Sequence, residues 1–283
     1  MRGRLLVGLA SAVVLTACGF AGATTPTSVA SSSSTSSSSS TTSTSSTTST
    51  TTTTIVVHRA PPLTGVVVGL DPGHNGGNWR DPAFIDHRVW NGREFEACDT
   101  TGTATDAGYP EAQFTWNVAV DARNVLQHLG ARVVLTRHSN GGVGPCITTR
   151  AEVLDRAHVD VAFDVHGDGG PPGGRGFAIL VPVRDAWNHR VVGSSLRLAH
   201  ELRTVFHQAT GMPWSTYDGV DAIQPRDDLA GLNLTTVPKV LIECGNMRNA
   251  TDARLLTSGS FQREAARAIV LAVFAFEGRR PTI

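Results

Sequence analysis

Short runs of consecutive apolar residues alternate with longer segments of helical periodicity over most of the chain after residue 62. A continuous apolar run is typical of a strand that is buried on both faces, as the strands of parallel sheets are. The alternation predicts an α/β fold, which we expect to be a single domain with a mostly parallel central sheet and helices on both faces. The expected strands lie at 66–70, 133–135, 161–163, 177–181 and 240–242, and the expected helices at 110–129, 189–208 and 262–274.

The first eighteen residues have the pattern of an export signal. Two arginines precede an apolar run at 5–15, which is too short to span a bilayer as a helix. The run leads into Leu-Thr-Ala-Cys, which resembles the lipobox of bacterial lipoproteins. We therefore expect residues 1–18 to be a lipoprotein-type signal peptide, with Cys18 as the lipid anchor. The alternatives are a secretory signal cut after a small residue such as Ala23, and a cytosolic chain.

Residues 19–62 consist largely of serine and threonine. A segment with so little apolar surface cannot offset the entropy of ordering its backbone, so we expect a disordered tether. The tether would join the anchor to a folded domain at 63–277. This arrangement predicts an exported domain held at the cell membrane, or a secreted protein if the signal is cleaved further along.

The charge balance excludes one class of partner. The chain has 24 lysines and arginines against 24 aspartates and glutamates, and removal of the signal would leave it slightly acidic. It has no excess of positive charge with which to neutralise a phosphate backbone, so we expect no nucleic acid partner. We expect a monomer that meets the membrane only through its lipid anchor.

Chemically active residues stand where the expected strands end. His74 follows the first strand, His166 the third and Glu243 the last, and each is close to a glycine. Glu111 adds a carboxylate on the first turn of the first helix. Because the carboxyl ends of parallel strands meet at one edge of a sheet, we expect these side chains to converge there. Two imidazoles and one carboxylate with an open position are the usual ligands of a catalytic zinc ion.

Several short motifs surround these residues: LDPGH at 70–74, PEA at 110–112, VVLTR at 133–137, FDVH at 163–166 and VPKVLIECGN at 237–246. Together they resemble the zinc-dependent N-acetylmuramoyl-L-alanine amidases of the amidase-3 type. The resemblance implies one bound zinc ion, with His74, Glu111 and His166 as ligands and Glu243 as the catalytic glutamate. Arg226 lies where the family has an arginine-containing segment before the last strand, and it is a candidate for substrate binding.

The resemblance also implies a reaction. The enzyme would be a peptidoglycan hydrolase that cleaves the amide bond between the lactyl group of N-acetylmuramic acid and L-alanine of the stem peptide. Its substrate would be peptidoglycan or soluble muropeptides, so the catalytic domain at 63–277 would face the cell wall. Zinc would supply an activated water molecule. Glu243, close to the metal but not bound to it, would take a proton from that water and pass it to the leaving amine.

Two other functions account for part of the pattern. Cys244 and His166 would be the nucleophile and the base of a Cys/His amide hydrolase, which leaves Glu111 and His74 without a role. A non-catalytic cell-wall-binding module would keep the site residues unused. For Glu243 itself, the alternative to catalysis is a buried carboxylate in an ion pair with Arg226 or Arg137.

The segment 78–107 is a long polar loop that carries four large aromatic residues. Loops of this length without regular structure are uncommon unless they are functional or fastened. Cys98 lies in this loop and Cys146 in a glycine-rich segment, and in an exported domain a disulfide between them is expected, with two free thiols as the alternative. The loop would form one wall of the substrate groove, where its aromatic rings stack on sugar or peptide. Between His166 and Arg226 the sequence holds one strand and one helix, so we expect an open cleft.

Overall fold

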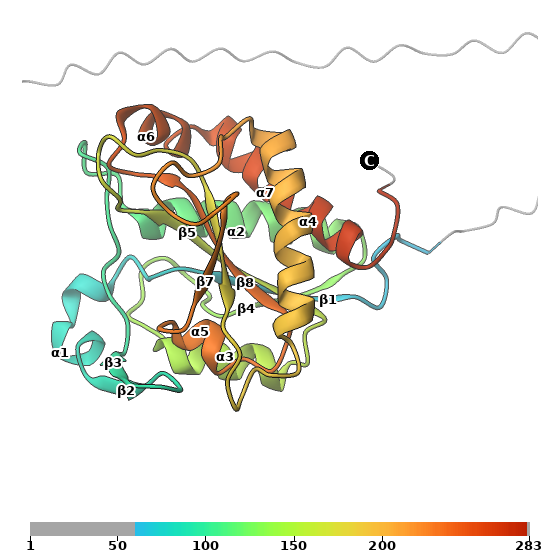
Figure 1. Ribbon diagram of the computed structural model, residues 1–283, viewed down its shortest axis with the longest axis horizontal. Helices are drawn as coiled ribbons and strands as arrows, with labels where there is room; N and C mark the ends of the chain where they lie inside the picture. Colours follow the sequence, from blue (N-terminus) through green and yellow to red (C-terminus); the bar gives the residue numbers. More distant parts are fainter. Residues whose placement is uncertain (1–59, 282–283) are drawn as a thin grey trace, which may run out of the picture. The chain divides into compact units, whose positions relative to one another are not determined.

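The structure, a computed structural model, describes residues 60–281, so residues 1–59, including Cys18 and most of the expected tether, lie outside it. A six-stranded sheet with the order β4-β1-β5-β8-β6-β7 forms its centre (Figure 1). Neighbouring strands are parallel from β4 to β8, β6 is antiparallel to β8, and β7 is parallel to β6. The strands are β1 (Val67–Pro72), β4 (Arg132–Leu135), β5 (Val161–Asp168), β6 (Ala178–Pro182), β7 (Ile223–Arg226) and β8 (Lys239–Asn246).

Helices cover both faces of the sheet, which confirms the predicted α/β class (Figure 1). One face carries the large hydrophobic core beneath α2, α4 and α7, and α6 packs against β8 and α7 at its edge. The other face carries two small apolar clusters beneath α3 and α5. The helices are α2 (Glu111–His128), α3 (Ile147–Arg156), α4 (Val192–Thr210), α5 (Ala230–Asn233), α6 (Ala250–Leu256) and α7 (Gly259–Phe276).

The five apolar runs all form strands, and the three predicted helices are α2, α4 and α7. β7 was missed because it is a short edge strand, Ile-Gln-Pro-Arg, without an apolar run. Between the end of β5 and the start of β7 the regular elements are the strand β6 and the helix α4, which matches the one strand and one helix expected there. Among the residues that the structure describes, no helix is long and apolar enough to cross a lipid bilayer.

The prediction that segment 78–107 lacks regular structure is wrong. It contains a 3-10 turn η1 (Asn78–Arg80), a short helix α1 (Pro82–Ile85) and an antiparallel hairpin of β2 (Arg88–Trp90) and β3 (Phe95–Ala97). These elements are too short to show a periodic pattern in the sequence. The side chain of Asp81 caps α1 by accepting a hydrogen bond from the backbone amide of Phe84.

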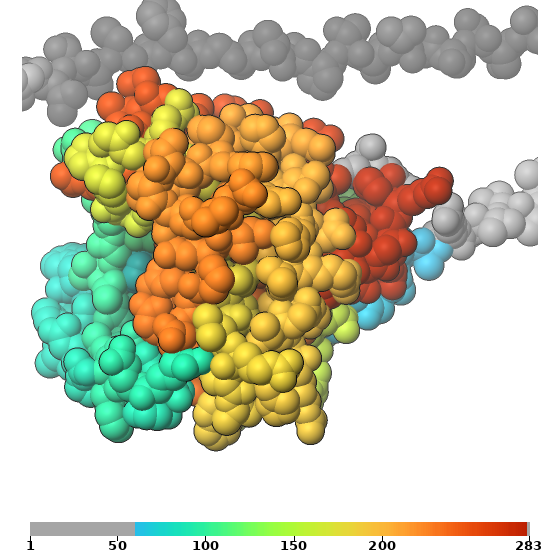
Figure 2. All heavy atoms as spheres, in the orientation of Figure 1, coloured from blue at the N-terminus to red at the C-terminus, as the bar shows by residue number. Residues whose placement is uncertain are grey.

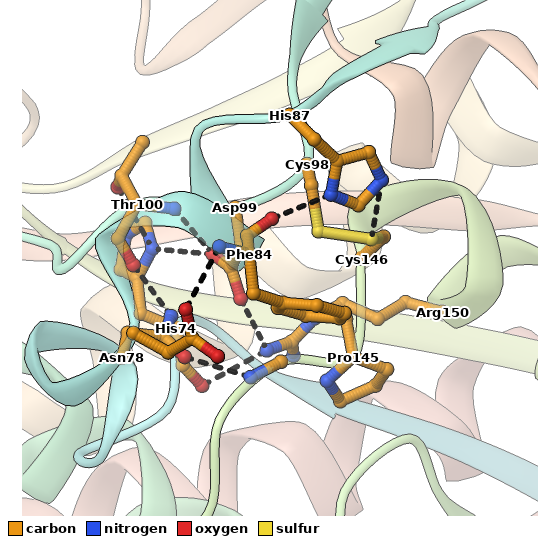
Figure 3. The surroundings of a disulfide bond; sticks show 12 residues. His74, Asn78, Phe84, His87, Cys98, Asp99, Thr100, Pro145, Cys146 and Arg150 are labelled. Atoms are coloured by element: carbon orange, nitrogen blue, oxygen red, sulfur yellow. Dashed lines mark hydrogen bonds and ion pairs between the residues drawn. A yellow bond between two sulfur atoms is a disulfide. The ribbon is translucent and has the colours of Figure 1, made fainter.

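The structure contains the predicted Cys98–Cys146 disulfide. Cys98 directly follows the β2–β3 hairpin, and Cys146 is the residue before α3 (Figure 3). The bond therefore fastens the end of the loop to the helix on the smaller-core face of the sheet. Asp99, the next residue after Cys98, reaches toward His74, so the disulfide lies directly beside the candidate site.

We expect the disulfide to contribute substantially to stability. It joins cysteines 48 residues apart. In the chain-entropy description, closing a loop of this length stabilises the folded state by about 4 kcal/mol. The double variant Cys98→Ser with Cys146→Ser should lose up to about this much free energy of unfolding, measured by urea denaturation. Reduced wild-type protein should match the variant, and reductant should leave the variant unchanged. Equal stability of variant and oxidised wild type would contradict the prediction.

Candidate metal centre and amidase site

Three side chains from distant parts of the chain meet at the carboxyl edge of the sheet. His74 lies two residues beyond β1, Glu111 is the first residue of α2, and His166 lies near the end of β5. One nitrogen or oxygen atom from each can be chosen so that all three lie within 4.8 Å of one another. His74 Nε2 is 3.5 Å from Glu111 Oε2, and His166 Nδ1 is 2.8 Å from Glu111 Oε1. The structure thus brings together the three residues that the sequence proposed as ligands.

Two glycines allow these side chains to approach so closely. A β-carbon on Gly73 would lie 2.2 Å from the ring of His166, closer than any real contact. A β-carbon on Gly102 would lie 2.5 Å from His74 Cδ2 and 2.7 Å from Glu111 Oε2, and Gly102 has a φ of +71° that disfavours other residues. The backbone on both sides of the cluster therefore requires glycine.

Backbone amides and charged neighbours hold the Glu111 carboxylate. Its Oε2 accepts a hydrogen bond from Thr103 N at 2.9 Å, and its Oε1 accepts one from Gly167 N at 3.2 Å. Burial by itself would raise the pKa of Glu111, but the two histidines and the backbone donors outweigh burial and lower the pKa to about 2. Glu111 is therefore ionised at neutral pH and able to bind a cation.

Each histidine has a second carboxylate on the side of the ring that faces away from Glu111. His74 Nδ1 lies 3.1 Å from Asp99 Oδ1, and His166 Nε2 lies 3.2 Å from Asp164 Oδ1. Carboxylates in this position fix the orientation of metal-binding imidazoles and raise their basicity. The sequence analysis did not single out Asp99 or Asp164, although Asp164 is in the FDVH motif and Asp99 follows a disulfide cysteine.

Glu243 lies beside the cluster on the neighbouring strand. It is the direct cross-strand partner of His166, so both side chains project from the same face of the sheet. Its Oε2 is buried and has no hydrogen-bond partner among residues 60–281. Burial and the nearby carboxylates of Glu111 and Asp168 raise the pKa of Glu243 well above its usual range, although the charge of His166 opposes them.

The ion pair considered for Glu243 is not formed. Arg226 donates to Asp228 at 2.7 and 2.6 Å, and Arg137 donates to backbone carbonyls that include Pro72 O and Ala112 O. The alternative in which Glu243 is a structural salt-bridge residue is therefore wrong. The prediction that Arg226 binds substrate stays a prediction, and its guanidinium is half-buried beside Asp228.

Tyr217 and Asp168 are further residues at this edge that the sequence analysis missed. The Tyr217 hydroxyl donates a hydrogen bond to Asp168 Oδ2 at 2.6 Å. The tyrosine ring lies against Gly170 and Gly174, where a β-carbon on either glycine would come within 2.4 Å of it. Tyr217 is thereby fixed near Glu243, whose charge contributes to the raised pKa of the tyrosine after burial and Asp168.

Cys244 cannot act with His166. Successive residues of a strand point to opposite faces, so Cys244 points away from Glu243 and into the large core, where it is fully buried. Burial is the main cause that raises the pKa of its thiol well above the usual range. A thiol in these surroundings is neither accessible nor ionised, and the alternative of a Cys244 nucleophile is wrong.

A cavity of about 190 Å³ lies against the His74 and His166 side of the cluster. One wall comes from the loop around the disulfide, and the opposite wall from α5 and the residue before it. Figure 2 shows the teal surface of this loop against the orange surface of the segment before β8, and Asn91 Nδ2 donates across this contact to Asp228 O. The lining includes Glu96, Ala97, Asp99, Thr100, Leu229, Ala230, Leu232 and Leu241.

The aromatic residues of the loop do not line this cavity. Trp79, Phe84, Trp90 and Phe95 are instead exposed on the protein surface, and the rings of Trp90 and Phe95 pack edge to face on the hairpin. The expectation that they stack on substrate within the groove does not hold for the cavity beside the cluster.

The fold and the cluster define the class of the protein: an α/β domain with a His/Glu/His group of metal-binding type and an unpaired glutamate at the carboxyl edge of its sheet. Residues 68–275 match the family described as Amidase_3, N-acetylmuramoyl-L-alanine amidase, and the chain belongs to this family. It is therefore an enzyme that cleaves peptidoglycan as an N-acetylmuramoyl-L-alanine amidase, and the alternative of a non-catalytic wall-binding module is wrong.

Mycobacterial amidases are among the similar proteins. N-acetylmuramoyl-L-alanine amidase Rv3717 of Mycobacterium tuberculosis is 38% identical over 215 residues, which cover 76% of this chain and 87% of that protein. The crystal structure of the amidase Ami1 from Mycobacterium smegmatis has a TM-score of 0.72 and 39% identity, over 76% of this chain and 98% of that one. The apo form of Ami1 from Mycobacterium abscessus has a TM-score of 0.71 and 41% identity, over 76% of this chain and all 100% of that one.

Proposed function

We propose that this amidase works with one zinc ion held by His74, Glu111 and His166. Two imidazoles and one carboxylate form a donor set typical of catalytic zinc sites, which keep one position open for water or substrate. The convergence of the three side chains within 4.8 Å supports the proposal, as do the carboxylates behind both imidazoles. When bound, zinc would lower the pKa of a water molecule and polarise the carbonyl of the scissile amide.

Glu243 would act as the general base and then as the general acid. Its partnerless Oε2, next to His166, is the observation that carries this assignment. A buried carboxylate oxygen without a donor is available to take a proton from the attacking water and to return it to the amine of L-alanine as the amide bond breaks. A divalent cation nearby would favour the ionised carboxylate, which opposes the effect of burial on its pKa.

The scissile bond would be the amide between the lactyl group of N-acetylmuramic acid and L-alanine of the stem peptide. A cavity lined by His74, His166, Asp99 and Asp164, but not by Glu111 or Glu243, lies beside the cluster and offers room for part of such a substrate. Arg226, half-buried in its pair with Asp228, remains our candidate for binding substrate at the opposite, β7 edge of the sheet.

We further propose that the enzyme is exported and held at the membrane by a lipid on Cys18, with secretion as the alternative. The lipobox-like sequence and the serine- and threonine-rich segment support this location. Both lie outside the described residues. The balanced charge supports a substrate other than nucleic acid, and we propose that the enzyme acts as a monomer.

Digestion of muropeptides tests the proposed chemistry. Zinc-loaded protein should release the stem peptide with a free L-alanine amine, identified by mass, and chelator should abolish the products until zinc is restored. Alkylation with iodoacetamide should leave activity unchanged, because Cys244 is buried. Cleavage that persists without metal would contradict the zinc mechanism, while cleavage of another bond would contradict the substrate assignment.

A further inference from the structure

A buried chain of charged side chains connects the two carboxylates that lie behind the histidines. Arg150 donates to Asp99 Oδ2 at 3.2 Å and to Asp71 Oδ1 at 3.0 Å. Lys239 Nζ lies 2.6 Å from Asp71 Oδ2 and 3.2 Å from Asp164 Oδ2. The five residues therefore form one continuous path that begins beside His74 and ends beside His166, and Figure 3 shows its first part around Asp99 and Arg150.

Lys239 is the cation of this path that contacts Asp164, the carboxylate behind His166. It lies at the start of β8 and reaches across β5 to Asp71 on β1. Its side chain is 0% exposed, and α5 closes over it: a β-carbon on Gly231 would lie 2.9 Å from Nζ. An ammonium group with no access to water is costly unless several acceptors surround it. Lys239 has two carboxylates, and one of them also faces His166.

A gain in the free energy of unfolding does not explain why these five charged side chains are buried together. Buried ion pairs contribute little net stability compared with apolar residues of the same size, because desolvation offsets their attraction. The path has two cations and three carboxylates, and its two outermost carboxylates each contact a histidine of the cluster. Without Lys239, Asp71 and Asp164 would be two buried carboxylates that repel each other with no ammonium between them, and Asp164 would no longer be held toward His166.

We propose that Lys239 is a positioning residue of the metal centre: through Asp164 it holds the imidazole of His166 in the orientation that binds the metal. This inference rests on the proposed zinc site. It adds Lys239 to that site, because Asp164 contacts His166 through one carboxylate oxygen and Lys239 through the other. Lys239 touches neither substrate nor metal, so its substitution acts on metal affinity through Asp164.

The test is zinc affinity, measured by competition with a chromogenic chelator. Lys239→Met keeps the length of the side chain and removes the charge, and we expect the zinc dissociation constant to rise by about 10- to 100-fold, the usual effect of losing a residue that orients a ligand. Cobalt-substituted protein should show an altered visible spectrum. Lys239→Arg, which can donate to both carboxylates, should restore much of the affinity.

Arg175→Met is the matched control. Arg175 pairs with the fully buried Asp252 at 3.1 Å and has no contact with the histidine cluster, so this variant should lose stability and keep its zinc affinity. If Lys239→Met does not fold, Asp164→Asn removes the carboxylate through which Lys239 acts on His166 with almost no change in shape, and the same loss of affinity is expected. Wild-type affinity in a folded Lys239→Met or Asp164→Asn protein would overturn the inference. Failure of wild-type protein to bind zinc would instead overturn the proposed zinc site.

Discussion

Glu243→Gln is expected to lower the turnover of muropeptides by about 10²–10⁴-fold, the range for loss of a general base. The amide has nearly the shape of the carboxylate but cannot accept a proton. Glu243 is not one of the three converging side chains, so the variant should bind as much zinc as wild-type protein. Steady-state kinetics and metal analysis by mass spectrometry on the same preparation measure both quantities.

The control for this variant is Glu152→Gln. Glu152 lies on the exposed face of α3 in an ion pair with Arg156, so the same chemical change there should leave turnover and zinc content unchanged. A Glu243→Gln protein that has lost its zinc would show that Glu243 is a ligand and that our roles are wrong. Turnover at the wild-type rate would show that another group takes the proton.

His166→Ala should remove both the zinc and the activity. The substitution deletes one of three ligands and also leaves Asp164 and Glu111 without the ring that lies between them. Two remaining ligands do not make the usual zinc site, which requires at least three from the protein. After gel filtration in metal-free buffer we expect less than one tenth of the wild-type zinc content, on the order of the 10- to 100-fold effects seen even for residues that only orient a ligand.

His200→Ala provides the matched comparison, because His200 is an exposed histidine on α4 far along the chain from the cluster residues. It should keep full zinc content and full activity. Circular dichroism of both variants separates loss of metal from loss of fold. Full zinc occupancy in a folded His166→Ala protein would exclude His166 as a ligand.

The amino-acid sequence alone is enough to place the main elements and the principal site residues. Strands β1, β5, β6 and β8 contain continuous apolar runs because both of their faces are buried, and this pattern is local. His74, His166 and Glu243 follow such runs, so the rule that parallel strands end at one edge of the sheet brings them together without knowledge of the coordinates. The position of Glu111 could be predicted because it is on the first turn of a helix that the sequence pattern indicates.

Glu243 and Cys244 differ in the face of β8 from which their side chains project. That face is known only once the pairing of β8 with β5 is known. The two residues are adjacent in the sequence, and both were candidates for catalysis. In the folded chain Glu243 points toward His166, while Cys244 is buried in the opposite core. A continuous apolar strand with both faces covered has no alternation from which this choice could be read.

The surroundings of the site depend on contacts between residues that are far apart in the sequence. Lys239 and Asp71 are separated by 168 residues, and neither lies in a local pattern that predicts a buried ion pair. The direction of β6 and the carboxylates behind His74 and His166 are of the same kind. The buried ion pairs form because the sheet brings β1, β5 and β8 side by side, and an ammonium or a carboxylate can be buried only where folding supplies its partner.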